Sequence, residues 1–422
     1  LPAVPAALPV IEIPEFHFHK VAPLFSNLPE AKQTVDIQPM EQFNQGWGTI
    51  LYRTTLPETT LAGTTLKITE VHDWAQIYAD GKLLARLDRR KGEFTTTLPA
   101  LKKGTQLDIL VEAMGRVNFD KSIHDRKGIT EKVELISGNQ TKELKNWTVY
   151  NFPVDYSFIK DKKYSDTKIL PTMPAYYKST FTLDKVGDTF LDMSTWGKGM
   201  VWVNGHAMGR FWEIGPQQTL FMPGCWLKEG ENEILVLDLK GPTRASIKGL
   251  KKPILDVLRE KAPETHRKDG EKLKLTGEKV AHEGAFTPGN GWQEVRFATP
   301  VKGRYFCLEA LSPQANDNIA AIAEFDVLGA DGKPVSREHW KIRYADSEET
   351  RSGNRTADKI FDLQESTFWM TVDNVPYPHQ LVIDLSKVEN VTGFRYLPRA
   401  EKGYPGMIKE YRVYVKPADF NY

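Results

Sequence analysis

Apolar and polar residues alternate along most of this chain in short segments, and glycine, asparagine and aspartate separate the segments. Such alternation predicts strands with one buried face and one exposed face. The pairs Asp80-Gly81, Lys103-Gly104 and Asn204-Gly205 follow apolar segments and predict tight turns. The chain is therefore expected to be all-β. The expected strands span residues 10–14, 49–56, 65–71, 74–79, 94–98, 107–112, 132–136, 200–203 and 234–239.

One segment departs from this alternation. Between residues 247 and 261 the apolar positions fall close to helical spacing, and Pro253 can occupy the first turn of a helix. The pattern predicts a short helix that leads into a charged linker. The apolar residues concerned are Ile247, Leu250, Ile254, Leu255 and Leu258.

A length of 422 residues allows about two to four domains. Turn spacing and shifts in composition predict three β-sandwiches in series. The predicted parts are a linker with one strand (1–38), a first sandwich (39–152), a second sandwich (153–245), a helical and charged linker (246–269) and a third sandwich (270–422).

Three blocks carry a resemblance to a known family. The block 200–239 contains a strand, the Asn204-Gly205 turn, an aromatic run and a final strand, and two earlier blocks span 46–56 and 109–119. These blocks resemble the two sandwiches that follow the catalytic domain in glycoside hydrolase family 35 β-galactosidases. The resemblance covers about residues 9–245 and implies galactose-binding-like jelly rolls.

The resemblance also implies a catalytic partner. Family members carry their two catalytic glutamates on a (β/α)8 barrel, and a barrel needs roughly 250 residues of alternating strand and helix. No such segment occurs in this sequence, so we expect no catalytic residue in it. The expected function is the non-catalytic C-terminal half of a retaining exo-β-galactosidase. Its expected partners are the absent barrel and glycans that contain β-galactosides.

In this family the loop at 115–119 leans toward the mouth of the barrel. Arg116, Asn118 and Phe119 are therefore candidates to line the active site, with Phe119 at a position where tyrosine is frequent. An equally strong alternative is that Arg116 and Asn118 only fix the loop internally.

The third domain resembles a discoidin-like, coagulation-factor C-type carbohydrate-binding module. The segments 358–369, 380–385 and 394–414 match the front half of such modules. The segment 303–327 reads like the back half, yet it comes first. This order predicts a circular permutation, which a closed sandwich with neighbouring termini tolerates.

Discoidin-like modules commonly hold a structural Ca²⁺, which needs six to eight oxygen ligands. By resemblance the ligands here would be Asp358, Asp362, Thr367 and Glu324. Leu363 and Gln364 stand where glycine and then Asn or Asp are frequent. The alternative is a metal-free turn fixed by an aspartate side chain. No cofactor is required for the expected function.

Sugar binding by the third domain would use an exposed aromatic ring and hydroxyl-binding polar groups. Because tryptophan is largely buried on average, the alternative is that most candidates belong to the core or its rim. The candidates are Trp292, Trp340, His379, Arg399 and Tyr404.

Composition restricts the partners, the membrane spans and the cysteine-based sites that can be expected. With 56 basic and 55 acidic residues, the net charge of +1 gives no reason to expect nucleic acid as a partner. No apolar run reaches the roughly 20 residues that span a bilayer. Cys225 and Cys307 fall in different predicted domains, so neither a disulfide framework nor a cysteine-based zinc site is expected. We expect an exported protein, periplasmic or extracellular, rather than a cytoplasmic one.

Two further function classes compete with the accessory role. A free-standing, multi-module lectin would bind carbohydrate without any barrel. Catalysis by the sandwiches alone would need a nucleophile and base, and no arrangement of this kind can be read from the sequence.

Overall fold

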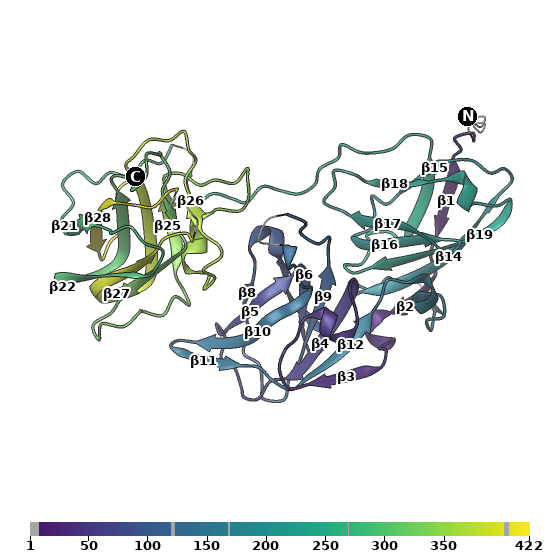
Figure 1. Ribbon diagram of the computed structural model, residues 1–422, viewed down its shortest axis with the longest axis horizontal. Helices are drawn as coiled ribbons and strands as arrows, with labels where there is room; N and C mark the ends of the chain where they lie inside the picture. Colours follow the sequence, from purple (N-terminus) through teal and green to yellow (C-terminus); the bar gives the residue numbers. More distant parts are fainter. Residues whose placement is uncertain (1–7, 120–122, 168, 269, 401–404) are drawn as a thin grey trace. The chain divides into compact units, whose positions relative to one another are not determined.

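The computed structural model describes residues 8–119, 123–167, 169–268, 270–400 and 405–422, and within them strands dominate (Figure 1). This confirms the all-β expectation. The chain divides into two compact units, of which one contains the second sandwich and the other contains the first sandwich and the third domain. Among the described residues, no helix is long and apolar enough to cross a membrane.

The first sandwich packs a four-stranded sheet, in the order β11-β10-β5-β8, against a six-stranded sheet, in the order β3-β12-β4-β9-β6-β7. Its core is the inward-facing apolar set that the alternation predicts, such as Ile68 on one sheet and Ile109 on the other. Asp80 and Gly81 both adopt positive φ, as a two-residue hairpin turn requires. The strands are β3 (Ala31–Thr34), β4 (Gly48–Thr55), β5 (Thr65–His72), β6 (Trp74–Ala79), β7 (Lys82–Asp88), β8 (Thr95–Thr97), β9 (Gln106–Ala113), β10 (Gly128–Ser137), β11 (Gln140–Glu143) and β12 (Trp147–Phe152).

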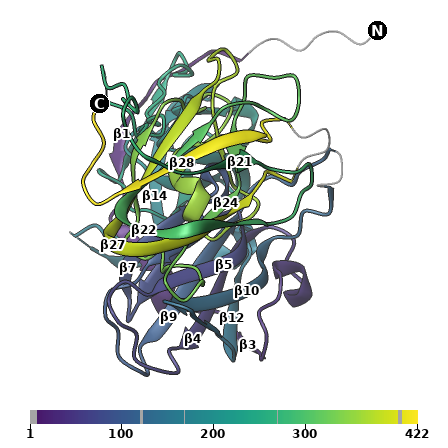
Figure 2. The same ribbon diagram turned by 90° about the vertical axis from the view of Figure 1, so that its left-hand side faces the viewer.

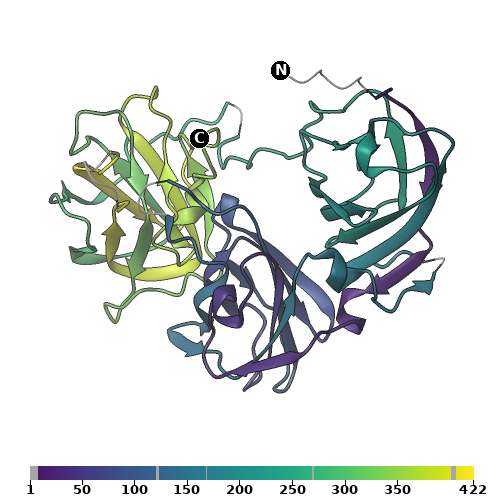
Figure 3. The same ribbon diagram turned by 45° about the vertical axis from the view of Figure 1, so that its right-hand side comes forward.

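The second sandwich pairs the sheet β1-β20-β15-β18 with the sheet β13-β2-β14-β19-β16-β17. Figure 3 shows the purple N-terminal segment running beside the teal strands of this sandwich. The strands are β1 (Ile13–His17), β2 (Lys20–Pro23), β13 (Ser165–Asp166), β14 (Ala175–Leu183), β15 (Thr189–Asp192), β16 (Lys198–Val203), β17 (His206–Trp212), β18 (Thr219–Met222), β19 (Gly230–Asp238) and β20 (Ser246–Leu250).

The N-terminal segment differs from the expected linker with a single strand at 10–14. It contributes three strands, β1, β2 and β3, and the first two complete the second sandwich although they precede the first one in the chain. The apolar residues Ile13, Phe18 and Val21 are buried in that core. Their burial is the physical reason that the segment is ordered rather than a tether.

Several residues of the block 200–239 are required by its backbone conformation and hydrogen bonds. Asn204 and Gly205 both have positive φ and join β16 to β17, which confirms the predicted hairpin. The Asn204 side chain also donates to the backbone of Trp226 at 2.9 Å. At the end of β19, the buried Asp238 carboxylate accepts backbone N–H groups from Gly197 at 2.7 Å and Gly241 at 2.9 Å. Burial outweighs these hydrogen bonds and raises the pKa of Asp238.

The predicted helix over 247–261 is wrong. Residues 246–250 form β20, which places Ile247 in the core of the second sandwich. The residues that follow run without helical hydrogen bonds beside the 214–218 turn, where Gln218 donates to Ile254 at 2.9 Å and Val257 donates to Pro216 at 3.0 Å. The apolar residues at helical spacing therefore lie in a strand and in an extended segment. The backbone groups of this region bond with neighbouring backbone instead of forming a helix.

The third domain is built on the sheet β21-β28-β22-β27-β24, with β25 also paired to β27 (Figure 2). The long strand β22 lies between β27 and β28, which follow it in the chain. The circular permutation stays a prediction. The strands are β21 (Val280–Ala285), β22 (Gln293–Ala310), β23 (Ala321–Ile322), β24 (Glu324–Leu328), β25 (Lys341–Ala345), β26 (Trp369–Met370), β27 (His379–Leu397) and β28 (Glu410–Lys416).

Helical turns are short and lie in the connections. The named turns of the described residues are α1 (Tyr156–Ile159), η1 (Leu24–Ser26), η2 (Met40–Phe43), η3 (Arg89–Lys91), η5 (Gly224–Trp226) and η6 (Ala357–Phe361).

Candidate functional site

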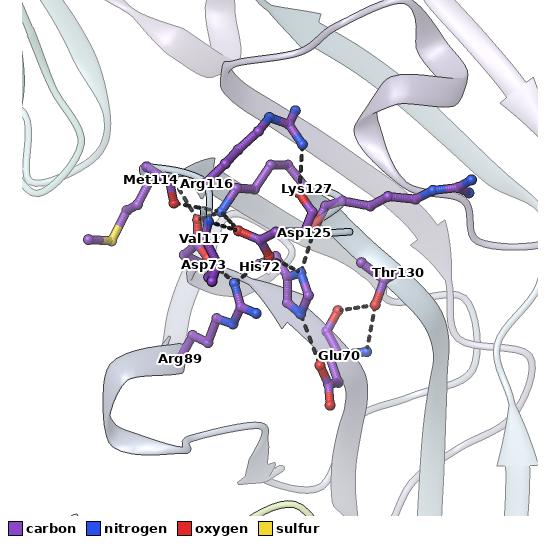
Figure 4. Close-up of polar contacts among 12 residues, drawn as sticks. Glu70, His72, Asp73, Arg89, Met114, Arg116, Val117, Asp125, Lys127 and Thr130 are labelled. Carbon is purple, nitrogen blue, oxygen red and sulfur yellow. Dashed lines mark hydrogen bonds and ion pairs between the residues drawn. The ribbon is translucent and has the colours of Figure 1, made fainter. Parts of the chain in front are cut away.

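A buried ionic network lies beneath the loop that follows β9 in the first sandwich (Figure 4). The Lys127 side chain is completely buried, and its Nζ lies 2.6 Å from Asp73 Oδ2 and 2.8 Å from Asp125 Oδ2. Nζ also donates to the Gly115 carbonyl at 3.0 Å. Arg89 bridges the same two aspartates, at 2.8 Å and 2.7 Å. Two acids and two bases therefore neutralise each other where a lone buried charge would be very costly.

Asp125 is the centre of this network. Burial alone would raise the pKa of its carboxyl group, but hydrogen bonds from Lys127, the Val117 backbone and Arg89 outweigh burial and lower the pKa to about 2. Asp125 is consequently ionised at any physiological pH. A permanently charged carboxylate holds its donors in place, including the loop backbone at Val117, which lies 3.0 Å away.

The network also fixes the rest of the loop. The Met114 N–H donates to Asp73 at 2.6 Å, so the carboxylate of a neighbouring connection holds the start of the loop. The Arg116 guanidinium donates to the carbonyls of Asp125 and Gly46, both at 2.6 Å, and pairs with Glu41 at 2.6 Å. Arg116 therefore fixes the loop internally, as the alternative interpretation of this residue required.

The tip of the loop is exposed. The structure leaves Phe119 80% exposed and Val117 38% exposed, although both side chains are apolar. Asn118 is exposed between them. An exposed aromatic side chain on a loop held by these contacts is suited to bind another molecule. The role of Asn118 and Phe119 at an active site stays a prediction.

Sequence reasoning missed the residues that support this loop. Asp73 joins β5 to β6, Arg89 lies in η3, and Asp125 and Lys127 share the connection from β9 to β10, so no spacing rule links the three segments. Asp73, Arg89 and Lys127 directly adjoin strand residues but Asp125 does not, so the group shares no common signal in the sequence. A charged residue at such a position is buried only when a partner meets it in space.

The candidate calcium ligands come together only in part. Thr367 Oγ1 donates to Asp362 at 2.7 Å and to the Gln364 carbonyl at 3.0 Å, which fixes the turn. Burial raises the pKa of Glu324 to about 8, with Arg337 opposing this rise and Asp362 adding to it. Burial likewise raises the pKa of Asp362 to about 7, against the nearby charge of Lys359. Burial is the largest cause of both rises in pKa, and the charge of Asp362 adds to the rise at Glu324.

One buried carboxylate oxygen near this turn lacks a hydrogen-bond partner in the described part of the chain. Glu324 Oε1 is buried and has no hydrogen-bond partner among the described residues, while its other oxygen pairs with Arg337. Asp358 differs from the expectation, because its carboxylate is partly exposed and faces Lys359 at 3.5 Å. Within the described ranges, no group of three or more His, Cys, Asp or Glu side chains is arranged to hold a metal. A metal here would need hydroxyl and backbone oxygens beside the two carboxylates.

The candidate sugar contacts separate into three groups. Trp340 is 6% exposed and His379 is completely buried, so both belong to the interior and the expectation that they face a sugar is wrong. His379 is held by Asp346 at 2.8 Å and by the Asn318 carbonyl at 2.7 Å. Trp292 and Arg399 keep part of their surface open. Tyr404 lies outside the described residues.

Comparisons with known proteins agree with this architecture. Residues 38–153 match the model "Beta-galactosidase, first all-beta domain", and residues 174–232 match "Beta-galactosidase, galactose-binding domain". Residues 344–422 match the F5/8 type C domain. The chain thus combines two domain types of β-galactosidases with a discoidin-like domain, as the sequence predicted.

Curated relatives cover the same region. The chain is 34% identical to beta-galactosidase-1-like protein 2 of Homo sapiens over 205 residues, 47% of this chain and 30% of that protein. It is 33% identical to a beta-galactosidase of Xanthomonas manihotis over 222 residues, 52% of this chain and 36% of that protein. For a beta-galactosidase of Bos taurus the identity is 35% over 255 residues, 53% of this chain and 37% of that protein. The chain spans about a third of the length of these relatives.

Among solved structures, an α-L-rhamnosidase of Streptomyces avermitilis aligns with 91% of this chain and 46% of its own, at 9% identity and a TM-score of 0.21. A lectin from Pleurotus ostreatus aligns with 57% of this chain and 82% of its own, at 10% identity and a TM-score of 0.18. Likeness at this level supports no conclusion about function.

Proposed function

We propose that this chain, which carries two β-galactosidase domains and a discoidin-like domain, is the accessory region of a retaining exo-β-galactosidase. In this proposal the barrel of the full enzyme carries both catalytic glutamates and hydrolyses terminal β-galactosyl residues. The sandwiches support the active site, and the third domain binds carbohydrate. The names of the curated relatives and of the matched domains support the substrate class.

The observation that carries the supporting role is the ionic network beneath the loop at 114–119. Three buried charged side chains, the partly exposed Arg89 and the Arg116 contacts hold a loop whose tip presents the exposed Phe119. A wall of a pocket must be rigid, because a misplacement of about 1 Å can cost on the order of a hundredfold in rate. We infer that Phe119 contacts the part of the substrate beyond the galactosyl group.

Kinetics can test this role when the chain is placed behind the catalytic region of a related β-galactosidase. Phe119→Ala should lower kcat/KM for long aglycones more than for nitrophenyl β-galactoside, because the side chain would contact only the longer ones. Leu61→Ala provides the matched control, since Leu61 is an exposed apolar side chain elsewhere on the same sandwich. Unchanged kinetics on both substrates, at an unchanged melting temperature, would exclude the loop from the active site. The chain alone should release no nitrophenol, and sustained turnover by it would refute the accessory role.

We further propose that a structural Ca²⁺ occupies the turn at 362–367. Asp362, Glu324 and Thr367 would hold the ion, whereas Asp358 would not contribute its side chain. The orphaned Glu324 Oε1 supports this proposal. The ion would neutralise two buried carboxylates and stiffen the turn next to Phe368 and Trp369.

A further inference from the structure

Two arginines share one aromatic ring in the third domain. The guanidinium carbon of Arg355 lies 4.1 Å from the centroid of the Phe368 ring, and that of Arg399 lies 4.5 Å from the same centroid. Phe368 stands between two buried residues, Thr367 and Trp369, and keeps part of its surface open. Stacking on a ring stabilises each cation but does not cancel its charge.

Arg355 has no carboxylate partner among the described residues. It is half-buried, and burial lowers the pKa of its guanidinium group. Glu349 pairs with Arg355 through the backbone but forms no ion pair with it among the described residues, and the Glu349 carboxylate accepts the N–H groups of Arg351 at 2.5 Å and Ser352 at 2.9 Å. The charge of Arg355 therefore stays uncompensated within the described structure.

Other arginines of this domain show that Arg355 is unusual. The guanidinium groups of Arg304, Arg337 and Arg343 lie 2.7 Å from Asp384, Asp326 and Asp419, respectively. In each case a carboxylate compensates the loss of hydration around the cation.

The second arginine adds to the positive charge. Burial lowers the pKa of the Arg399 guanidinium, the charge of Arg355 lowers it further, and Asp317 acts in the opposite direction. One Arg399 nitrogen lies 3.1 Å from the Met370 sulfur, which is a weak acceptor. The Arg355 guanidinium, without a carboxylate partner among the described residues and stacked on a half-open ring, is complementary to an anion, and Arg399 stacks on the same ring.

We propose that Arg355, Arg399 and Phe368 form a subsite for the acidic group of a sugar, either the carboxylate of a uronic acid or a sulfate ester. This inference rests on the proposed carbohydrate binding by the third domain and assigns its ligand class. The planar guanidinium fork of arginine fits both anions, since each presents a pair of oxygens at matching spacing. The ring of Phe368 keeps the two forks pre-organised, which lowers the entropic cost of binding.

Calorimetric titration of the full chain tests the proposal with three monosaccharides: galactose, galacturonate and galactose 6-sulfate. At least one acidic sugar should bind about tenfold more tightly than galactose, and added NaCl should weaken that preference. Which of the two acidic sugars binds identifies the natural anion. Arg355→Gln should remove the preference for the acidic sugar over galactose.

The control variant is Arg412→Gln, which removes a positive charge from β28 of the same domain, where Arg412 pairs with Glu283 at 3.3 Å. This variant should keep the full preference. If Arg355→Gln lowers the melting temperature, Arg355→Lys serves instead, and it should retain part of the preference as a point charge. Equal binding of acidic and neutral sugars, unaltered by either Arg355 variant, would overturn the acidic subsite and leave sugar binding intact. Binding of none of the three would overturn both proposals.

Discussion

Two buried acidic clusters of this chain behave in opposite ways. In the first sandwich, Lys127, Arg89 and a backbone N–H lower the pKa of Asp125 to about 2. In the third domain, burial raises the pKa of Glu324 to about 8 and that of Asp362 to about 7. Burial disfavours the charged form in both places, so the number of cations and donors around each carboxylate decides the direction.

The two clusters differ in whether every buried oxygen has a partner. The Asp125 cluster is neutral by itself and fixes a loop. The cluster of the third domain retains a buried oxygen, Glu324 Oε1, without a hydrogen-bond partner among the described residues. Folding tolerates such a group when the site has a further role, of which metal binding is one. A buried carboxylate whose oxygens are all paired with cations or donors therefore indicates a structural role. A buried carboxylate with an unpartnered oxygen indicates a ligand site.

The largest expected effect comes from breaking the compensated cluster. Lys127→Met would leave Asp73 and Asp125 buried with one cation fewer and should cost about 3–5 kcal/mol of unfolding free energy. Urea unfolding of the full chain measures the loss. Lys132→Met is the control on β10, the strand that follows Lys127, because the Lys132 side chain is 44% exposed and an ion pair with one exposed partner is worth less than about 1 kcal/mol. Equal losses in the two variants would contradict the view that Lys127 completes a buried cluster.

A smaller effect should follow from completing the second cluster. Ca²⁺ at about a hundred times its Kd should stabilise the chain by about 2.7 kcal/mol relative to chelator, since it binds only the folded turn. Thermal unfolding with and without Ca²⁺ gives the shift. Asp362→Asn should abolish the shift, whereas Asp331→Asn, a change at an exposed aspartate of the same domain, should preserve it. A wild-type chain indifferent to Ca²⁺ would favour the metal-free turn fixed by Thr367.

The smallest effect concerns the turn backbone. Leu363 has a φ of 65°, a left-handed conformation that costs a residue with a side chain about 1–2 kcal/mol and costs glycine little. Leu363→Gly should therefore be more stable than Leu363→Ala by about 1 kcal/mol, as both lose the same packing. Chemical unfolding of the two variants measures this difference. The reverse order would show that packing of the turn outweighs its backbone geometry.

The residue pattern was sufficient to predict nine of the strands, six of them in the first sandwich. The expected strand at 74–79 matches β6, and the one at 65–71 lies within β5. Asp80-Gly81 and Asn204-Gly205 form the expected turns, because only a few residue types adopt positive φ at low cost. Alternation and turn chemistry are local properties, and each can be read without knowledge of the rest of the chain.

Features that depend on distant partners could not be predicted in this way. The apolar spacing at 247–261 suits a helix, but pairing with β1 and β15 places residues 246–250 in a sheet. His379 can be buried because its ring bonds to the Asp346 carboxylate, and Asp346 lies 33 residues earlier in the chain. In each case a long-range contact outweighs the local preference, because packing and hydrogen bonding contribute more free energy than intrinsic propensity.

The sequence by itself therefore determined the strands of the first sandwich, the tight turns and the two families that the domains resemble. Tertiary structure alone decided which charges are compensated. Asp73, Arg89 and the pair Asp125 and Lys127 meet from three segments of the chain, whereas Arg355 lies beside Glu349 and forms no ion pair with its carboxylate among the described residues. The energy of a buried charge depends on atoms within a few ångströms, and no linear pattern fixes those neighbours.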